Sequence, residues 1–138
     1  MILTKLLNKT NAKIYLITLP WIGENENSKI LEIVKSHNKV IEGLAIKYKL
    51  EIIPFFEGIK TIINAKNDNW LISKSKYEIT YKRMFRIIRA IFLHYIFRVS
   101  WNNVSKRYQL KTLCDFIHLN DNGGLIISAL VQTRLDKK

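Results

Sequence analysis

An aspartate and a histidine stand three residues apart towards the end of the chain, as Asp115 and His118. They lie in a turn-rich stretch just before the apolar run 125–131. Histidine exchanges a proton near neutral pH, and a neighbouring aspartate can fix its tautomer and stabilise the imidazolium. The spacing therefore predicts the acid–base half of a hydrolytic site, which still needs a nucleophile. The alternatives are a solvated histidine and a carboxylate that only caps a turn.

Composition indicates one domain covering residues 1–138, because 48% hydrophobic content in 138 residues is enough for a core. Cys114 is the only cysteine, so neither an intramolecular disulfide nor a cysteine-type metal site can form. The N-terminus resembles no signal peptide, and the longest apolar region, 87–99, is too short and too charged to span a membrane. We expect a cytoplasmic protein, with peripheral attachment to a membrane as the alternative.

The chain carries 23 basic and 11 acidic residues, giving a net charge of +12. Such an excess is typical of proteins that meet nucleic acid or an anionic membrane. Lysine also outnumbers arginine 17 to 6, and isoleucine and asparagine are plentiful, as AT-rich codon usage would produce. The overall charge alone therefore leaves both explanations open.

The first half of the chain predicts a strand, a helix and a second strand. Residues 12–19 form a β-rich apolar run ended by Pro20, as expected of a buried strand. Ser28 can cap a helix that ends near Leu50, and residues 51–56 follow as a short strand with Pro54 at its end or edge. This order implies a parallel crossover. We also expect a short helix over residues 1–8 and a polar loop over residues 23–27.

Residues 58–112 read as a helical region with a strong basic bias. Between residues 74 and 111 there are ten basic residues and one acidic residue. The pattern predicts a basic amphipathic helix, with Lys82, Arg86 and Arg89 on one stripe and Met84, Ile88, Ile91 and Tyr95 on another. Its apolar stripe could pack on its own domain or lie on an anionic membrane. Nucleic acid is an unlikely partner, because no phosphate loop, zinc spacing or RNA-binding aromatic motif accompanies it.

Three segments resemble the C-terminal half of the SGNH/GDSL hydrolases, which are serine esterases and lipases. They are AKIYLITLPWIGEN, SHNKVIEGLAIKYKLEIIPFFE and CDFIHLNDNGGLIISALV, in that order. The last is similar to the family's final Asp-x-x-His block, and Asn38 falls where many members have an asparagine. The resemblance implies a partial flavodoxin-like three-layer α/β/α fold with a parallel sheet, its N-terminal strands missing, and a helical insertion at about 58–112. It implies no cofactor and no metal.

The resemblance gives His118 the role of general base and Asp115 that of orienting its imidazole. Members place the nucleophile in a Gly-Asp-Ser motif and take oxyanion donors from a glycine and an asparagine; none of these blocks is found. The serines lie in no such motif; they are Ser28, Ser36, Ser73, Ser75, Ser100, Ser105 and Ser128. We therefore expect the isolated chain to have no efficient serine-esterase activity.

Two functional hypotheses follow from these observations. The first is the C-terminal portion of a carboxylic-ester hydrolase, acting on an ester that the sequence does not specify. An N-terminal hydrolase half or a second copy of the chain would then be its partner, because a half-sheet leaves an open edge. The second is a non-catalytic module that contacts an anionic membrane surface or another protein through the basic amphipathic helix.

Overall fold

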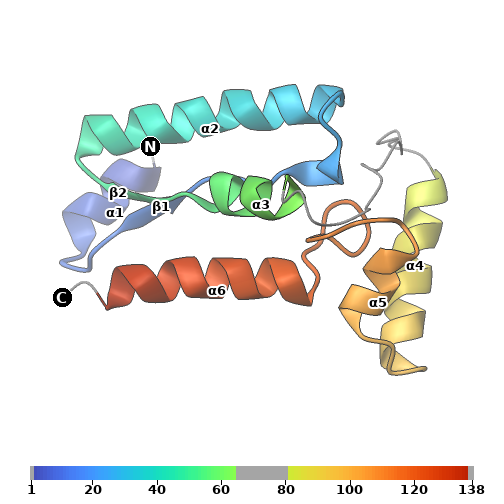
Figure 1. Ribbon diagram of the computed structural model, residues 1–138. Helices are drawn as coiled ribbons and strands as arrows, with labels where there is room; N and C mark the ends of the chain where they lie inside the picture. The colour runs from blue at the N-terminus through green and yellow to red at the C-terminus, as the bar shows by residue number, and fades with distance from the viewer. Residues whose placement is uncertain (1, 65–80, 137–138) are drawn as a thin grey trace.

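The computed structural model describes residues 2–64 and 81–136. Within these ranges the chain is a mixed α/β protein with one two-stranded parallel sheet and six α-helices. The elements follow in the order α1 (Ile2–Lys9), β1 (Tyr15–Ile17), the 3₁₀ turn η1 (Ile22–Glu24), α2 (Lys29–Tyr48), β2 (Glu51–Ile53), α3 (Phe55–Ile63), α4 (Tyr81–Tyr95), α5 (Trp101–Lys106) and α6 (Asp121–Leu135). Figure 1 shows their arrangement.

The sheet confirms the predicted parallel pairing, with Leu16 opposite Ile52 at its centre. β1 is shorter than the predicted strand over residues 12–19, and it is not buried, because Ile17 is 41% exposed. Among the described residues β2 is the only strand paired with β1, so no strand of this part of the chain lies along the other edge of β1. Pro54 ends β2 as predicted, but the next two residues belong to α3 and not to the strand.

Helices cover both faces of this small sheet: α2 lies on one side and α6 on the other (Figure 1). The predicted cap of α2 is confirmed, since the Ser28 hydroxyl accepts a hydrogen bond from the Leu31 N–H at 3.3 Å. α3 packs on α6, and Gly58 is the point of close approach. The main core lies between these layers and consists of Trp21, Leu31, Val34, Phe55, Phe56 and Ile59.

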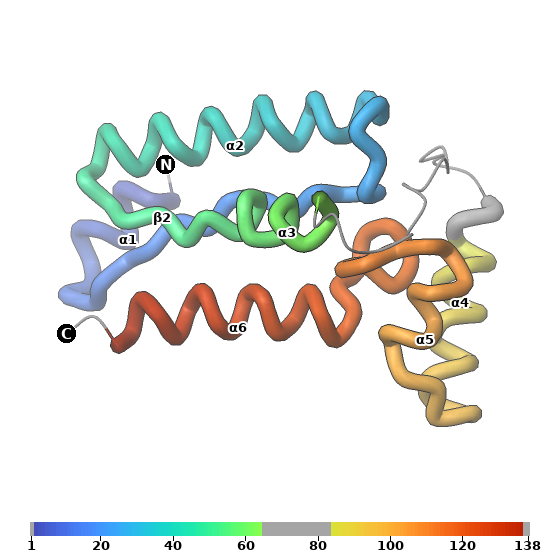
Figure 2. Tube along the Cα trace, in the orientation of Figure 1, coloured from blue at the N-terminus to red at the C-terminus, as the bar shows by residue number. Residues whose placement is uncertain are grey.

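α4 and α5 pack on each other at one end of the molecule (Figure 2). This is the end at which α6 begins, opposite the C-terminal ends of α2 and α6. The predicted helical region 58–112 is thus divided in space, because α3 belongs to the layered body. Its residues 65–80 lie outside the described ranges. Among the helices that the structure describes, none has the length and apolar character needed to cross a membrane.

The two strands run side by side, and their carboxyl ends point towards the end of the molecule where α5 leads into α6 (Figure 1). In open α/β sheets, ligands bind beyond the carboxyl ends of the strands. The connection between α5 and α6, residues 107–120, occupies this position and contains Asp115 and His118.

Candidate functional site

A tight turn brings Asp115 and His118 together. Leu113 and Leu119 form an isolated antiparallel bridge, and the Cys114 N–H donates to the His118 carbonyl at 2.8 Å. Phe116 takes a left-handed backbone conformation, with φ of 79°, that lets the chain reverse direction. This conformation is unfavourable for a bulky residue, so it must be held by surrounding contacts. The Phe116 ring is buried, and its carbonyl accepts a 3.0 Å hydrogen bond from the Gly23 N–H.

The two side chains form a short hydrogen bond, with 2.7 Å between Asp115 Oδ2 and His118 Nδ1. The second carboxylate oxygen accepts the backbone N–H groups of Ile117 at 3.2 Å and His118 at 2.8 Å. The Asp115 side chain is 3% exposed, whereas the His118 side chain is 61% exposed. The carboxylate therefore fixes the ring through Nδ1 and also caps the turn, while Nε2 is the nitrogen available for proton exchange.

A cavity of about 430 Å³ lies beside the imidazole. Its walls come from α4, the start of α5 and the turn itself, and most of them are apolar. The lining residues are Ile87, Ala90, Ile91, Tyr95, Trp101, Cys114, Asp115, His118 and Leu119. An apolar cavity with one acid–base pair at its wall suits a substrate with a hydrocarbon part and one polar reacting centre.

Cys114 lines the same cavity, but its chemistry argues against a nucleophilic role. Burial raises the pKa of the Cys114 thiol to about 12, and the negative charge of Asp115 acts in the same direction. The thiolate is the nucleophilic form of cysteine, so a thiol with so high a pKa stays protonated and unreactive at neutral pH.

None of the serines in the described ranges is hydrogen-bonded to His118. The Ser105 hydroxyl is buried and committed to other partners, since it donates to the Trp101 carbonyl at 2.6 Å and accepts from Asn120 Nδ2 at 2.8 Å. Ser73 and Ser75 lie outside the described residues. The two other histidines bind main-chain carbonyls: His37 contacts Ile33 O and His94 contacts Val99 O.

Glu24 is the buried residue that anchors the loop leading into the site. Its Oε1 accepts the N–H and hydroxyl of Thr112, both at 2.7 Å, and the Leu113 N–H at 2.9 Å. Its Oε2 accepts the Lys111 N–H at 2.6 Å. Residues 23–27 form turns between β1 and α2 as predicted, but Glu24 within them is buried, with 3% of its surface exposed. The sequence around Glu24 gives no signal of this role, because the residues whose hydrogen bonds Glu24 accepts are nearly ninety positions away.

Asn120 ties the other end of the loop to α6. Its Oδ1 accepts the Gly123 N–H at 3.0 Å and thereby caps the helix, while Nδ2 donates to Ser105 Oγ and to the Lys111 carbonyl. Gly123 is needed for close packing: an added Cβ would collide with the Thr112 carbonyl oxygen and lie 2.9 Å from Leu119 Cδ2. Gly124, in contrast, faces open space.

Asn38 performs a similar task at the end of β1. Its Oδ1 accepts the Leu19 N–H at 2.7 Å, and its Nδ2 donates to the Leu19 carbonyl at 3.2 Å. Both main-chain groups of Leu19 are thus satisfied by one side chain from α2. This pairing fixes the path of the chain as it leaves the sheet towards Glu24.

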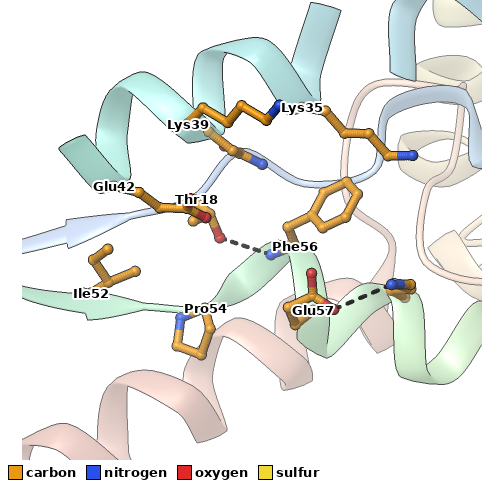
Figure 3. A pocket seen from close by; sticks show the side chains of 10 residues that line it. Thr18, Lys35, Lys39, Glu42, Ile52, Pro54, Phe56 and Glu57 are labelled. Carbon is orange, nitrogen blue, oxygen red and sulfur yellow. Dashed lines mark hydrogen bonds and ion pairs between the residues drawn. The ribbon is translucent and has the colours of Figure 1, made fainter. Parts of the chain in front are cut away.

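A second hollow of about 310 Å³ lies between α2, β2 and the start of α3 (Figure 3). The Thr18 hydroxyl accepts the Phe56 N–H at 2.9 Å there, which joins the end of β1 to α3. Its charged lining residues are Lys35, Lys39, Glu42, Glu57 and Lys60. It contains no histidine or cysteine and shares no lining residue with the cavity beside His118.

No three His, Cys, Asp or Glu side chains come together as a potential metal site in the part of the chain that the structure describes. Comparison of the chain with protein-family models, with curated proteins and with solved structures finds no match. The geometry of Asp115 and His118 is therefore the strongest indication of chemistry in this molecule.

Proposed function

We propose that this chain is the C-terminal portion of an SGNH-type carboxylic-ester hydrolase and supplies its Asp–His pair. The observation that carries the proposal is the 2.7 Å bond between a buried Asp115 carboxylate and His118 Nδ1, with the ring exposed beside an apolar cavity. A general base in ester hydrolysis needs this tautomer, with Nε2 free to take a proton from a hydroxyl group.

Each residue then has a defined task. His118 Nε2 takes the proton of a serine hydroxyl as that oxygen attacks the ester carbonyl, and returns it to the departing alcohol. It next takes a proton from the water that attacks the acyl-serine carbonyl, and gives that proton to the serine oxygen as the acyl–serine bond breaks. Asp115 holds the ring in place and stabilises the imidazolium formed in each step.

The architecture is compatible with this assignment. Two parallel strands lie between α2 and α6, and the Asp–His turn follows at the carboxyl ends of the strands. A flavodoxin-like α/β/α sheet contains more strands than these two, and the open edge of β1 is where further strands would pair.

The serine and the oxyanion donors must come from another segment under this proposal, because none of the described serines is positioned beside His118. The isolated chain is then not an efficient esterase, since covalent catalysis and the oxyanion donors supply much of the rate. The partner that supplies them is an N-terminal hydrolase half. A second copy of the chain would pair along the open edge of β1 but would bring only the same serines.

The test is ester hydrolysis by the native assembly, purified with whatever polypeptides accompany the chain in its source. His118→Ala should lower turnover of p-nitrophenyl butyrate at least about 100-fold, the usual contribution of a general base. His37→Ala is the matched control, because this exposed histidine of α2 bonds only its own helix. Turnover unaffected by His118→Ala would overturn the proposal.

A further inference from the structure

From Met84 onward, where the structure describes its side chains, every exposed residue of α4 except Arg89 is apolar. Large hydrophobic side chains cover its exposed side, and each is between 47% and 72% exposed. They form the α4 apolar face, which consists of Met84, Phe85, Ile88, Ile91, Phe92 and Tyr95 on the helix and Ile96 and Phe97 in the turn after it. A contiguous apolar surface of this kind marks an interaction site in a water-soluble domain.

Inward contacts fix which side of α4 faces the protein. The Arg86 guanidinium lies over the rings of Tyr108 and Phe116, 5.8 and 5.2 Å from their centroids. His94 stacks on Trp101 with 4.0 Å between ring centroids, and Ala90 is buried. Ile88 and the other exposed side chains of this stripe are therefore turned mainly away from the described part of the domain, although Ile91 and Tyr95 also border the cavity beside His118.

The positive charge around the α4 apolar face indicates which kind of partner binds there. Residues 84–111 contain six basic residues and no acidic residue. Arg89 is exposed on α4 itself, and Arg98 is exposed just after the face. A second copy of the chain would bring another net charge of +12 to the same place, whereas an anionic surface would be attracted.

We propose that the α4 apolar face docks on a membrane surface rich in anionic lipid. The helix lies in the interface, with its aromatic and aliphatic side chains among the acyl chains and its arginines at the headgroups. Ile91 and Tyr95 also line the cavity beside His118, so docking brings this cavity to the lipid surface. The docking itself is independent of catalysis.

Co-sedimentation of the full chain with lipid vesicles tests the proposal. Binding is expected to vesicles that mix phosphatidylglycerol with phosphatidylcholine, to be weak with phosphatidylcholine alone, and to fall as salt is added. Phe92→Asp should lower the partition coefficient at least about tenfold through lost apolar burial. Arg89→Glu should lower it about tenfold at low salt through reversed charge.

The control is Ile46→Asp, because Ile46 is 80% exposed but lies near the end of α2, far from α4 (Figure 2). It should bind vesicles like the unchanged chain, and so should His118→Ala, which separates docking from the proposed function. Absence of vesicle binding, or equal binding by Phe92→Asp, would overturn the proposal. The proposal would also be overturned if the unchanged chain does not bind vesicles but self-associates, and Phe92→Asp abolishes that self-association.

Discussion

Glu24→Gln tests whether one buried carboxylate holds in place the loop 107–120, which carries Asp115 and His118. Glutamine keeps the shape of the side chain but removes the charge and turns one acceptor oxygen into an N–H₂ donor. The remaining oxygen can still accept the N–H and hydroxyl of Thr112 and the N–H of Leu113. The new amide group faces the Lys111 N–H, which Glu24 Oε2 accepts at 2.6 Å, so two donors oppose each other.

The expected loss can be worked out from these contacts. A hydrogen bond to a charged acceptor contributes about 1 kcal/mol more than one to a neutral acceptor, and three such bonds are weakened. The opposed donors at Lys111 add about 1 kcal/mol or more. Allowing for non-additivity, Glu24→Gln should lower the free energy of unfolding by about 3 kcal/mol, a large part of the stability of a small domain.

Urea unfolding followed by tryptophan fluorescence measures this loss, because Trp21 is buried in the main core. Glu26→Gln is the matched control, since Glu26 is exposed in the same loop and makes no such network. It should change stability by less than about 0.5 kcal/mol. A Glu24→Gln chain as stable as the Glu26→Gln chain would refute the role assigned to Glu24.

Two further predictions concern the same loop. Gly123→Ala should destabilise the protein by about 2 kcal/mol, because its Cβ collides with the Thr112 carbonyl, whereas Gly124→Ala should be neutral or slightly stabilising; thermal unfolding compares them. Cys114 should react with iodoacetamide at pH 8 far more slowly in the folded chain than in urea. Its pKa is raised from 9.0 to about 12, so the unfolded chain releases this proton first. The contribution of the Cys114 thiol to the free energy of unfolding is therefore fully present below pH 9 and is lost as the pH rises towards 12. Cys114→Ala should lack this part of the decline.

The local features of the fold were predictable from the sequence. Ser28 and the 3.6-residue apolar period defined α2, and Pro54 marked the end of β2. Asp115 and His118 are three residues apart in one turn, so a contact between them requires only local geometry.

The features that escaped prediction depend on distant contacts. Glu24 binds residues 111–113, and nothing in the sequence around it distinguishes a buried loop carboxylate from a solvated one. The cavity beside His118 needs α4 to pack against the turn. The pattern predicted Arg86 and Arg89 on one basic stripe, but the Arg86 guanidinium lies over Tyr108 and Phe116, whereas Arg89 is exposed. The side chain of Lys82, predicted on the same stripe, lies outside the described residues.

Covalent labelling of the native assembly with a fluorophosphonate probe tests the central claim most directly, because this probe reacts with a serine that a base has activated. The account predicts labelling of one serine on a polypeptide that accompanies this chain in the native assembly, lost in His118→Ala and kept in His37→Ala. The isolated chain should remain unlabelled. An unlabelled native assembly, or labelling that persists without His118, would contradict the assignment of Asp115 and His118 to ester hydrolysis.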